Sequence, residues 1–134
     1  MTENPLRFAG YAGLFDIADA DHDTIRKGAF ATSLARRTVP VPLLWQHRPN
    51  EPIGEIETAF EDDRGLAVIG RIDRLECLAA AMLKRGDITG LSFGYRARKA
   101  QPTHTGRELL GIDLFEVSLV THPLQHGARV HLIA

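Results

Sequence analysis

The sequence is short of the features that mark exported, membrane-spanning or nucleic-acid-binding proteins. Cys77 is the one cysteine, so no disulfide can form within the chain, as is usual in a reducing compartment. No apolar run approaches the roughly 20 residues of a membrane span, and Met1–Pro5 lacks the basic and apolar character of a signal peptide. The formal net charge of −1 gives little attraction for nucleic acid or an anionic membrane. We therefore expect a cytosolic protein that is not secreted and binds neither partner.

Recognisable cofactor motifs are also missing, including the glycine-rich loops that bind phosphates or dinucleotides. The acidic segment 16–23 lacks the central glycine and closing glutamate of a calcium loop, so we interpret it as a solvated loop. Histidines gather at His122, His126 and His131, where Pro123 and Gly127 interrupt any helix that would align the first two. We interpret these histidines as part of a polar surface loop, and we expect no cofactor and no metal. A metal-dependent hydrolase that uses them is the alternative left open.

The chain does have the composition of a soluble globular protein, with 44% hydrophobic and 25% charged residues. Its 134 residues predict a single domain, 1–134. Many short strands interrupted by two helices predict a mainly β fold, either a β-barrel flanked by helices or a strongly curved sheet. Asp73 is the expected N-cap of the second helix and Gly86 its left-handed C-cap. The expected strands are 6–15, 43–47, 53–60, 66–73, 88–99, 109–120 and 129–133, and the expected helices are about 30–36 and 75–85.

The segment Thr89–Tyr95 predicts a strand with two contrasting faces. One face carries large apolar and aromatic side chains, whereas the other carries Ser92 between Gly90 and Gly94. Glycine inside a strand often marks a place where a ligand or another backbone comes close. Ser92 is therefore a candidate nucleophile with room for an extended peptide beside it, bounded by the two glycines. The alternative is a barrel corner where glycine relieves crowding and the serine is incidental.

Two further residues are candidates for acid–base chemistry. His47 ends an apolar segment, and imidazole titrates near neutrality, so it is either a general base or a satisfied edge residue. Glu116 lies within the apolar stretch Leu114–Val120, where an unpaired carboxylate is costly to bury. It therefore either faces water or has a fixed partner. That partner would be an arginine of the serine strand, Arg96 or Arg98, or the imidazole of a triad.

Three residues compete for these roles. Ser118 shares a strand face with Glu116 and is the competing nucleophile, although it lacks flanking glycines. Asp113 competes with Glu116, but the alternation of the strand places it on the opposite face. His122 is a second candidate for the group that orients the imidazole.

Taken as an ordered set, five segments resemble the prohead proteases of tailed bacteriophages. The resemblance runs from about residue 8 to residue 128, nearly the whole chain. Each motif alone is weak, but five in the same order are specific. The segments are Gly10-Tyr11-Ala12 with the acidic loop after it, Lys27-Gly28-Ala29-Phe30, Leu44-Trp45-Gln46-His47, Ile88–Tyr95 and Leu114–Pro123.

This family is similar to the herpesvirus assemblins, serine proteases built on a β-barrel flanked by helices. The resemblance implies that Ser92 is the nucleophile, His47 the general base and Glu116 the third member of a triad. Backbone amides of the loop 121–127 are the oxyanion donors implied by analogy. A homodimer is also implied, although little of the chain remains after the last motif to form its interface.

The resemblance further implies a substrate and a location. The substrate would be the scaffold or the N-terminal extension of the major capsid protein, and the protease itself, cleaved inside the prohead in the bacterial cytoplasm. A phage, a prophage or a gene transfer agent would each encode such a chain. The alternative function is a non-catalytic assembly protein that retains the protease fold and binds capsid or scaffold.

Overall fold

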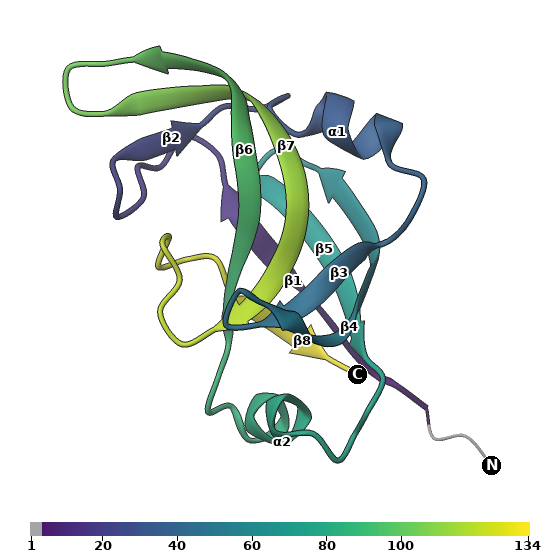
Figure 1. Ribbon diagram of the computed structural model, residues 1–134. Coiled ribbons are helices and arrows are strands. Elements are labelled where there is room, and N and C mark those ends of the chain that lie inside the picture. Colours follow the sequence, from purple (N-terminus) through teal and green to yellow (C-terminus); the bar gives the residue numbers. More distant parts are fainter. Residues whose placement is uncertain (1–3) are drawn as a thin grey trace.

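The computed structural model describes residues 4–134 and is organised around one eight-stranded sheet that curls on itself (Figure 1). Residues 1–3, part of the N-terminal stretch in which we expect no signal peptide, lie outside the described residues. The elements are β1 (Leu6–Leu14), β2 (Asp23–Ile25), α1 (Ala31–Arg36), β3 (Val41–Trp45), β4 (Arg48–Glu61), β5 (Gly65–Ile72), α2 (Leu78–Arg85), β6 (Gly90–Pro102), β7 (Arg107–Val120) and β8 (Val130–Ile133).

β7 is the strand around which the site is assembled. It pairs along its length with β6 on one side, and on the other side with β2 near its start and β3 near its end. The order then continues through β4, β5, β1 and β8. Buried apolar side chains from these strands fill the inside of the curl, among them Leu43, Leu91, Leu114 and Leu119. Because successive side chains of a strand point to opposite faces of the sheet, the same strands place polar residues on the other face.

The segment just before β8 brings the two ends of the curl together. Ala128 O accepts from Leu91 N on β6, and Arg129 O accepts from Tyr11 N on β1. Val130 N donates to Thr89 O, which adds a second link to β6. The curl is therefore held almost closed by backbone hydrogen bonds beside the start of the serine strand.

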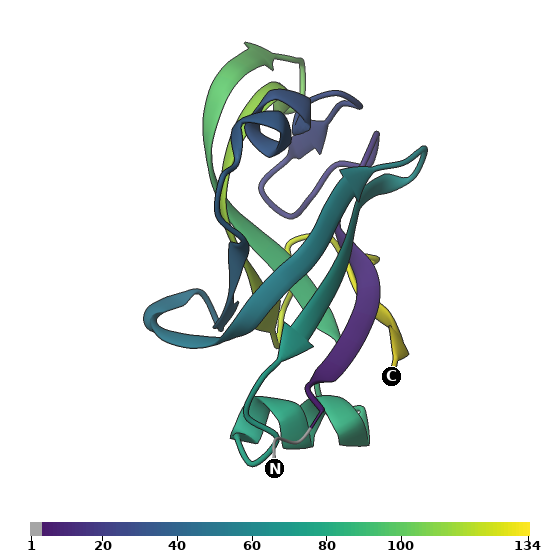
Figure 2. The ribbon, with the colours of Figure 1, turned by 90° about the vertical axis from the view of Figure 1, so that its right-hand side faces the viewer.

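The two helices lie at opposite ends of the curled sheet (Figures 1 and 2). α2 buries Ala79, Ala80 and Leu83 and ends at Gly86, which has the left-handed φ of 77° expected of a C-cap. The expectation of Asp73 as N-cap is wrong, because the helix begins at Leu78 and Cys77 is its cap. Asp73 is engaged elsewhere, since its carboxylate accepts from Arg71 on β5.

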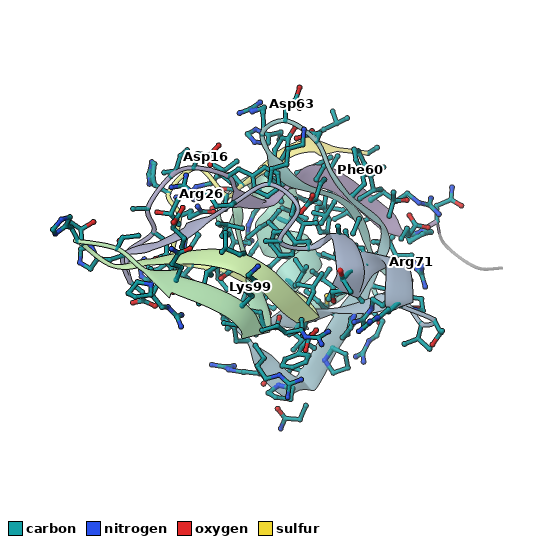
Figure 3. All side chains as sticks on the ribbon, turned by 90° about the horizontal axis from the view of Figure 1, so that it is seen from above. Asp16, Arg26, Phe60, Asp63, Arg71 and Lys99 are labelled. Carbon is teal, nitrogen blue, oxygen red and sulfur yellow. The ribbon has the colours of Figure 1, made fainter. Side chains whose placement is uncertain are left out.

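Charged side chains form the outside of the molecule, as the view from above shows (Figure 3). Arg26 pairs with Asp16, and Arg71 pairs with Asp73 and Glu55. No helix in residues 4–134 is long and apolar enough to cross a membrane.

The predicted fold class, mainly β and flanked by two helices, is confirmed. The sequence predicts seven strands and misses β2, a three-residue strand at the end of the acidic loop. Asp23, which the sequence places in a solvated loop, is buried and pairs with Arg107, while Tyr95 also donates to it. The hydrogen bond from the Arg107 guanidinium is the main cause that holds the pKa of Asp23 below its usual range, and the bond from Tyr95 adds to it.

Candidate active site

His47 lies in a two-residue turn that joins β3 to β4. Trp45 and Arg48 pair across the turn, and both Gln46 and His47 have left-handed φ values, 53° and 60°. Tight hairpins need positive φ at both positions, and Asn-Gly is the usual choice because other side chains are strained there. A glutamine and a histidine persist in such a turn only where the surroundings hold them.

The surroundings that hold the turn come from the end of β7. Gln46 N donates to Leu119 O, and the Gln46 side chain makes two hydrogen bonds with Thr121. Its Nε2 donates to Thr121 Oγ1 at 2.7 Å, and its Oε1 accepts from Thr121 N at 3.1 Å. His47 N donates to Ser118 Oγ at 3.1 Å. His47 is therefore held against β7 by its own backbone N–H and by the hydrogen bonds of Gln46.

The His47 ring also contacts β7, where Nδ1 lies 2.6 Å from Glu116 Oε1. An ionised carboxylate can only accept, so Nδ1 carries the proton and Nε2 is left free to take one. The hydrogen bond from Glu116 raises the pKa of His47 above its ordinary value, against an opposing effect of burial. The side chain of Glu116 is 13% exposed and that of His47 42%, so the pair opens to solvent on the histidine side.

The second carboxylate oxygen of Glu116 has its own partner. Ser118 Oγ donates to Glu116 Oε2 at 2.6 Å, the length of a charge-assisted O–H···O⁻ bond. Ser118 itself is fully buried. Both oxygens of the carboxylate are therefore fixed, one by the imidazole and one by the hydroxyl.

Ser92 lies directly across from Ser118 in the antiparallel β6–β7 pair. Residues opposite each other in such a pair share a face, with Cβ atoms about 5 Å apart. Ser92 therefore lies on the face that carries Ser118 and Glu116. It is only 6% exposed. The Ser92 hydroxyl makes no hydrogen bond among the described residues. Every fully buried side-chain oxygen of these residues has a hydrogen-bond partner, so the Ser92 hydroxyl is not fully buried and reaches the surface.

The glycines on either side of Ser92 are packed closely from within the chain. A Cβ at Gly90 would lie 2.5 Å from Val120 O, and a Cβ at Gly94 would lie 2.2 Å from Glu116 Oε1. Gly94 thus leaves the space in which the Glu116 carboxylate crosses β6. Substrate binding at these two glycines stays a prediction.

The competing assignments separate in the structure. Arg96 and Arg98 both pair with Asp113, which is directly opposite Arg96 in the register and away from Glu116. His122 is exposed, and Glu116 rather than His122 holds the His47 ring. Within residues 4–134 no three His, Cys, Asp or Glu side chains converge in a geometry that would hold a metal ion.

The loop between β7 and β8 passes beside the serine strand and is anchored by one buried amide. Gln125 Oε1 accepts from Leu14 N, and its Nε2 donates to Leu14 O and Ile17 O. The loop therefore rests on the end of β1 through Gln125 and on β6 through Ala128. Its backbone is held in place next to Ser92 without using any of the three candidate catalytic side chains.

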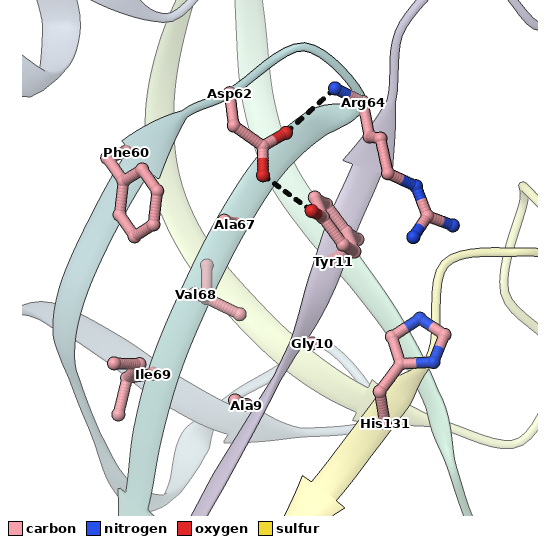
Figure 4. Close-up of a pocket in the computed structure, with 10 residues that line it drawn as sticks. All are labelled: Ala9, Gly10, Tyr11, Phe60, Asp62, Arg64, Ala67, Val68, Ile69 and His131. Atoms are coloured by element: carbon pink, nitrogen blue, oxygen red, sulfur yellow. Dashed lines mark hydrogen bonds between the residues drawn. The ribbon is translucent and has the colours of Figure 1, made fainter.

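A hollow of about 330 Å³ lies on another face, over β1, β4 and β5 (Figure 4). Tyr11 donates to Asp62 there, with Arg64 over its ring and His131 at its edge. The hollow contains none of the residues His47, Ser92 and Glu116.

Two solved structures that resemble this chain are herpesvirus proteases. The varicella-zoster virus protease matches with a TM-score of 0.63 and 20% identity, over 96% of this chain and 64% of that one. KSHV protease, in a complex with a hexapeptide phosphonate inhibitor, matches with a TM-score of 0.69 and 16% identity, over 98% and 65%. At such identities the likeness shows the fold, which is that of a herpesvirus protease.

The chain belongs to the caudovirus prohead serine protease family, which it matches over residues 2–134. The prohead protease of Enterobacteria phage HK97 is 35% identical, over 92% of this chain and 58% of the relative. The capsid polyprotein of Pseudomonas phage PAJU2 is 32% identical, over 72% of this chain and 16% of the relative. The chain thus spans less than two thirds of the length of these relatives. The family and fold expected from the five segments are confirmed.

Sequence reasoning missed three residues that surround the site. Gln46 and Thr121 clamp the turn, and Ser118, considered as a competing nucleophile, binds Glu116 instead. Only the position of Gln46 next to His47 hinted at its contact. A left-handed turn at Gln-His has no sequence signal, because the pair that marks such turns is Asn-Gly.

Proposed function

We propose that this chain is a serine endopeptidase in which Ser92 is the nucleophile, His47 the general base and Glu116 the residue that orients the base. The observation that carries the proposal is the 2.6 Å contact from His47 Nδ1 to Glu116 Oε1, on the sheet face that also carries Ser92. A histidine oriented by a carboxylate next to a serine is the constellation of nucleophilic acyl transfer. Membership of the prohead serine protease family supports the same assignment.

The proposed reaction uses His47 Nε2, the ring nitrogen that carries no proton. Ser92 Oγ attacks the peptide carbonyl carbon, and its proton moves to His47 Nε2 while Glu116 holds Nδ1–H. The tetrahedral intermediate then collapses, His47 returns the proton to the leaving amine, and an acyl-enzyme remains. A water activated by His47 hydrolyses the ester and regenerates Ser92.

The oxyanion needs preorganised donors, and we assign them to the loop beside Ser92. Within residues 121–128, Thr121 N already donates to Gln46 and Ala128 N to Gln125 O, and Pro123 has no N–H. The remaining candidates are the backbone N–H groups of residue 122 and residues 124–127. Gln125, whose side chain anchors the loop, keeps them in place.

The proposed substrate is the capsid protein or its scaffold, and the protease itself, cleaved inside the prohead. Two names support this: the HK97 relative is a prohead protease, and the PAJU2 relative is a capsid polyprotein within which a segment like this chain lies. A homodimer and an origin in a gene transfer agent stay predictions.

Labelling with a fluorophosphonate probe tests the assignment of the nucleophile. The wild type is expected to gain one probe, mapped by peptide mass to Ser92, and Ser92→Ala to gain none. The matched control is Ser33→Ala, which changes a serine of α1 that accepts from Leu114 N outside the site. A probe on Ser118, or a wild type that cleaves capsid protein while Ser92 stays unlabelled, would contradict the assignment.

A further inference from the structure

Ser118 is the only polar group that contacts both Glu116 and the backbone of His47 in the described part of the chain. Its hydroxyl donates to Glu116 Oε2 at 2.6 Å and accepts from His47 N at 3.1 Å. It is fully buried on β7, where Leu44 of β3 lies alongside it. One hydroxyl therefore links the strained turn to the carboxylate that the turn faces.

We propose that Ser118 is a positioning residue that holds the His47–Glu116 pair in its reactive geometry. The inference rests on the proposed function, which assigns His47 and Glu116 to catalysis. The carboxylate needs two donors to be fixed in rotation, and His47 Nδ1 supplies only the first. Ser118 supplies the second, and by accepting from His47 N it also fixes the turn that carries the imidazole.

The contacts of Ser118 exclude its use as the nucleophile. Its proton is directed at a carboxylate rather than at the imidazole nitrogen that would have to remove it. It has no exposed surface through which a peptide could reach it, whereas the Ser92 hydroxyl reaches the surface. The same sheet face thus carries two serines with different roles. Ser92 lies at the surface, and Ser118 is buried beneath Glu116.

Plain core packing is the competing explanation, because buried hydroxyls are nearly always hydrogen-bonded whatever their function. The two explanations differ in what they predict for His47. A packing role makes Ser118 matter for stability alone, whereas a positioning role makes it matter for the proton affinity of the imidazole.

The experiment compares wild type, Ser118→Ala and Ser118→Cys, whose thiol is a poor donor, with Ser33→Ala as the control. Like Ser118, Ser33 accepts a hydrogen bond from a backbone N–H, here that of Leu114 on β7 at 2.9 Å. Ser33→Ala therefore removes a comparable bond away from the site. The pKa of His47 is followed by NMR, with the signal assigned through His47→Gln. Cleavage is followed as kcat and KM against pH.

In Ser118→Ala and Ser118→Cys we expect the pKa of His47 to fall toward its ordinary value, because Glu116 rotates away from Nδ1. We expect kcat to fall by up to about 100-fold with KM little changed, as for a misplaced catalytic group. Ser33→Ala should leave both unchanged. A His47 pKa equal to that of wild type in a folded Ser118→Ala protein would overturn the proposal. Because this NMR measurement needs no activity, it decides the role of Ser118 even where the protease assignment fails, which Ser92→Ala reports separately.

Discussion

The carboxylate of Glu116 lies against the backbone of Gly94, the residue opposite it on β6. A Cβ built at Gly94 would come within 2.2 Å of Glu116 Oε1, the oxygen that His47 contacts. Cγ and Cδ of the glutamate also lie within 3.0 Å of that Cβ, so the end of the Glu116 side chain would have to shift. A glycine is thus required at position 94 of β6, where the Glu116 carboxylate passes to reach His47.

Gly94→Ala is therefore expected to abolish most activity while leaving the protein folded. The added methyl displaces the carboxylate from His47, and a displacement near 1 Å costs about 100-fold in rate. Gly111→Ala on β7 is the control, since a Cβ there meets nothing closer than 3.4 Å. Cleavage rates and melting temperatures of the two variants are the measurement. Equal activity in both would show that the position of Glu116 does not matter.

Glu116→Gln tests the electrostatic part of the pair. Glu116 raises the pKa of His47 chiefly through its hydrogen bond, so the neutral amide should let that pKa fall. The base must be unprotonated, so activity of the wild type rises as pH passes the His47 pKa, and this limb should move to lower pH in the variant. The maximal kcat should fall by about 10²- to 10⁴-fold, as when the orienting acid of a triad is replaced. An unmoved limb would contradict the role of Glu116.

The same pair predicts how stability depends on pH. A group whose pKa is raised on folding stabilises the protein below its unfolded pKa, about 6.5 for histidine, and this contribution is lost as pH rises through the folded pKa. The free energy of unfolding of wild type should therefore exceed that of His47→Gln more at pH 5.5 than at pH 8.5. Urea denaturation measures both differences. His104→Gln, in the exposed loop between β6 and β7, is the control for the loss of a histidine outside the site. A difference that grows toward high pH would contradict the raised pKa.

The turn that carries His47 gives a separate prediction about Gln46. Gln46→Ala loses both bonds to Thr121 but keeps the left-handed backbone, whereas Gln46→Gly loses the bonds and relieves the strain. Relief of this kind is worth about 1 kcal/mol, so the glycine variant should be the more stable of the two by urea denaturation. Both variants should be slower than wild type, because they lose the two bonds from the Gln46 side chain that help to fix the turn on β7. Full activity in Gln46→Gly would show that the clamp serves stability alone.

Much of this fold could be predicted, because its signals are local. Alternation along 89–95 and 114–120 identifies β6 and β7, and Gly86 marks the end of α2 by its need for positive φ. The start of α2 was placed too early, since the charge pattern after Asp73 mimics a cap while Arg71 occupies that carboxylate. β4 was also placed too late, because the prolines after Arg48 indicate a break, yet the hairpin continues through them.

The candidate site was predictable as chemistry but not as geometry. A carboxylate in an apolar strand needs a partner, and this reasoning left His47 and two arginines as choices. The choice depends on register: Asp113 lies opposite Arg96, and Glu116 opposite Gly94. Register is set by pairing between distant segments, and bulges in β6–β7 shift it further. The contacts of Gln46 and Ser118 depend on the same pairing and were therefore missed.

The central claim, that Ser92 cleaves capsid protein, is tested most directly by co-expression with the major capsid protein of the same gene cluster. Wild type and Ser92→Ala are compared by intact mass of the capsid protein. We expect shortening with wild type alone, at a site that the mass identifies. Shortening with both would assign the cleavage to another residue or a host enzyme. No shortening with either, despite folded protein and assembled shells, would contradict the protease assignment and favour a non-catalytic assembly role.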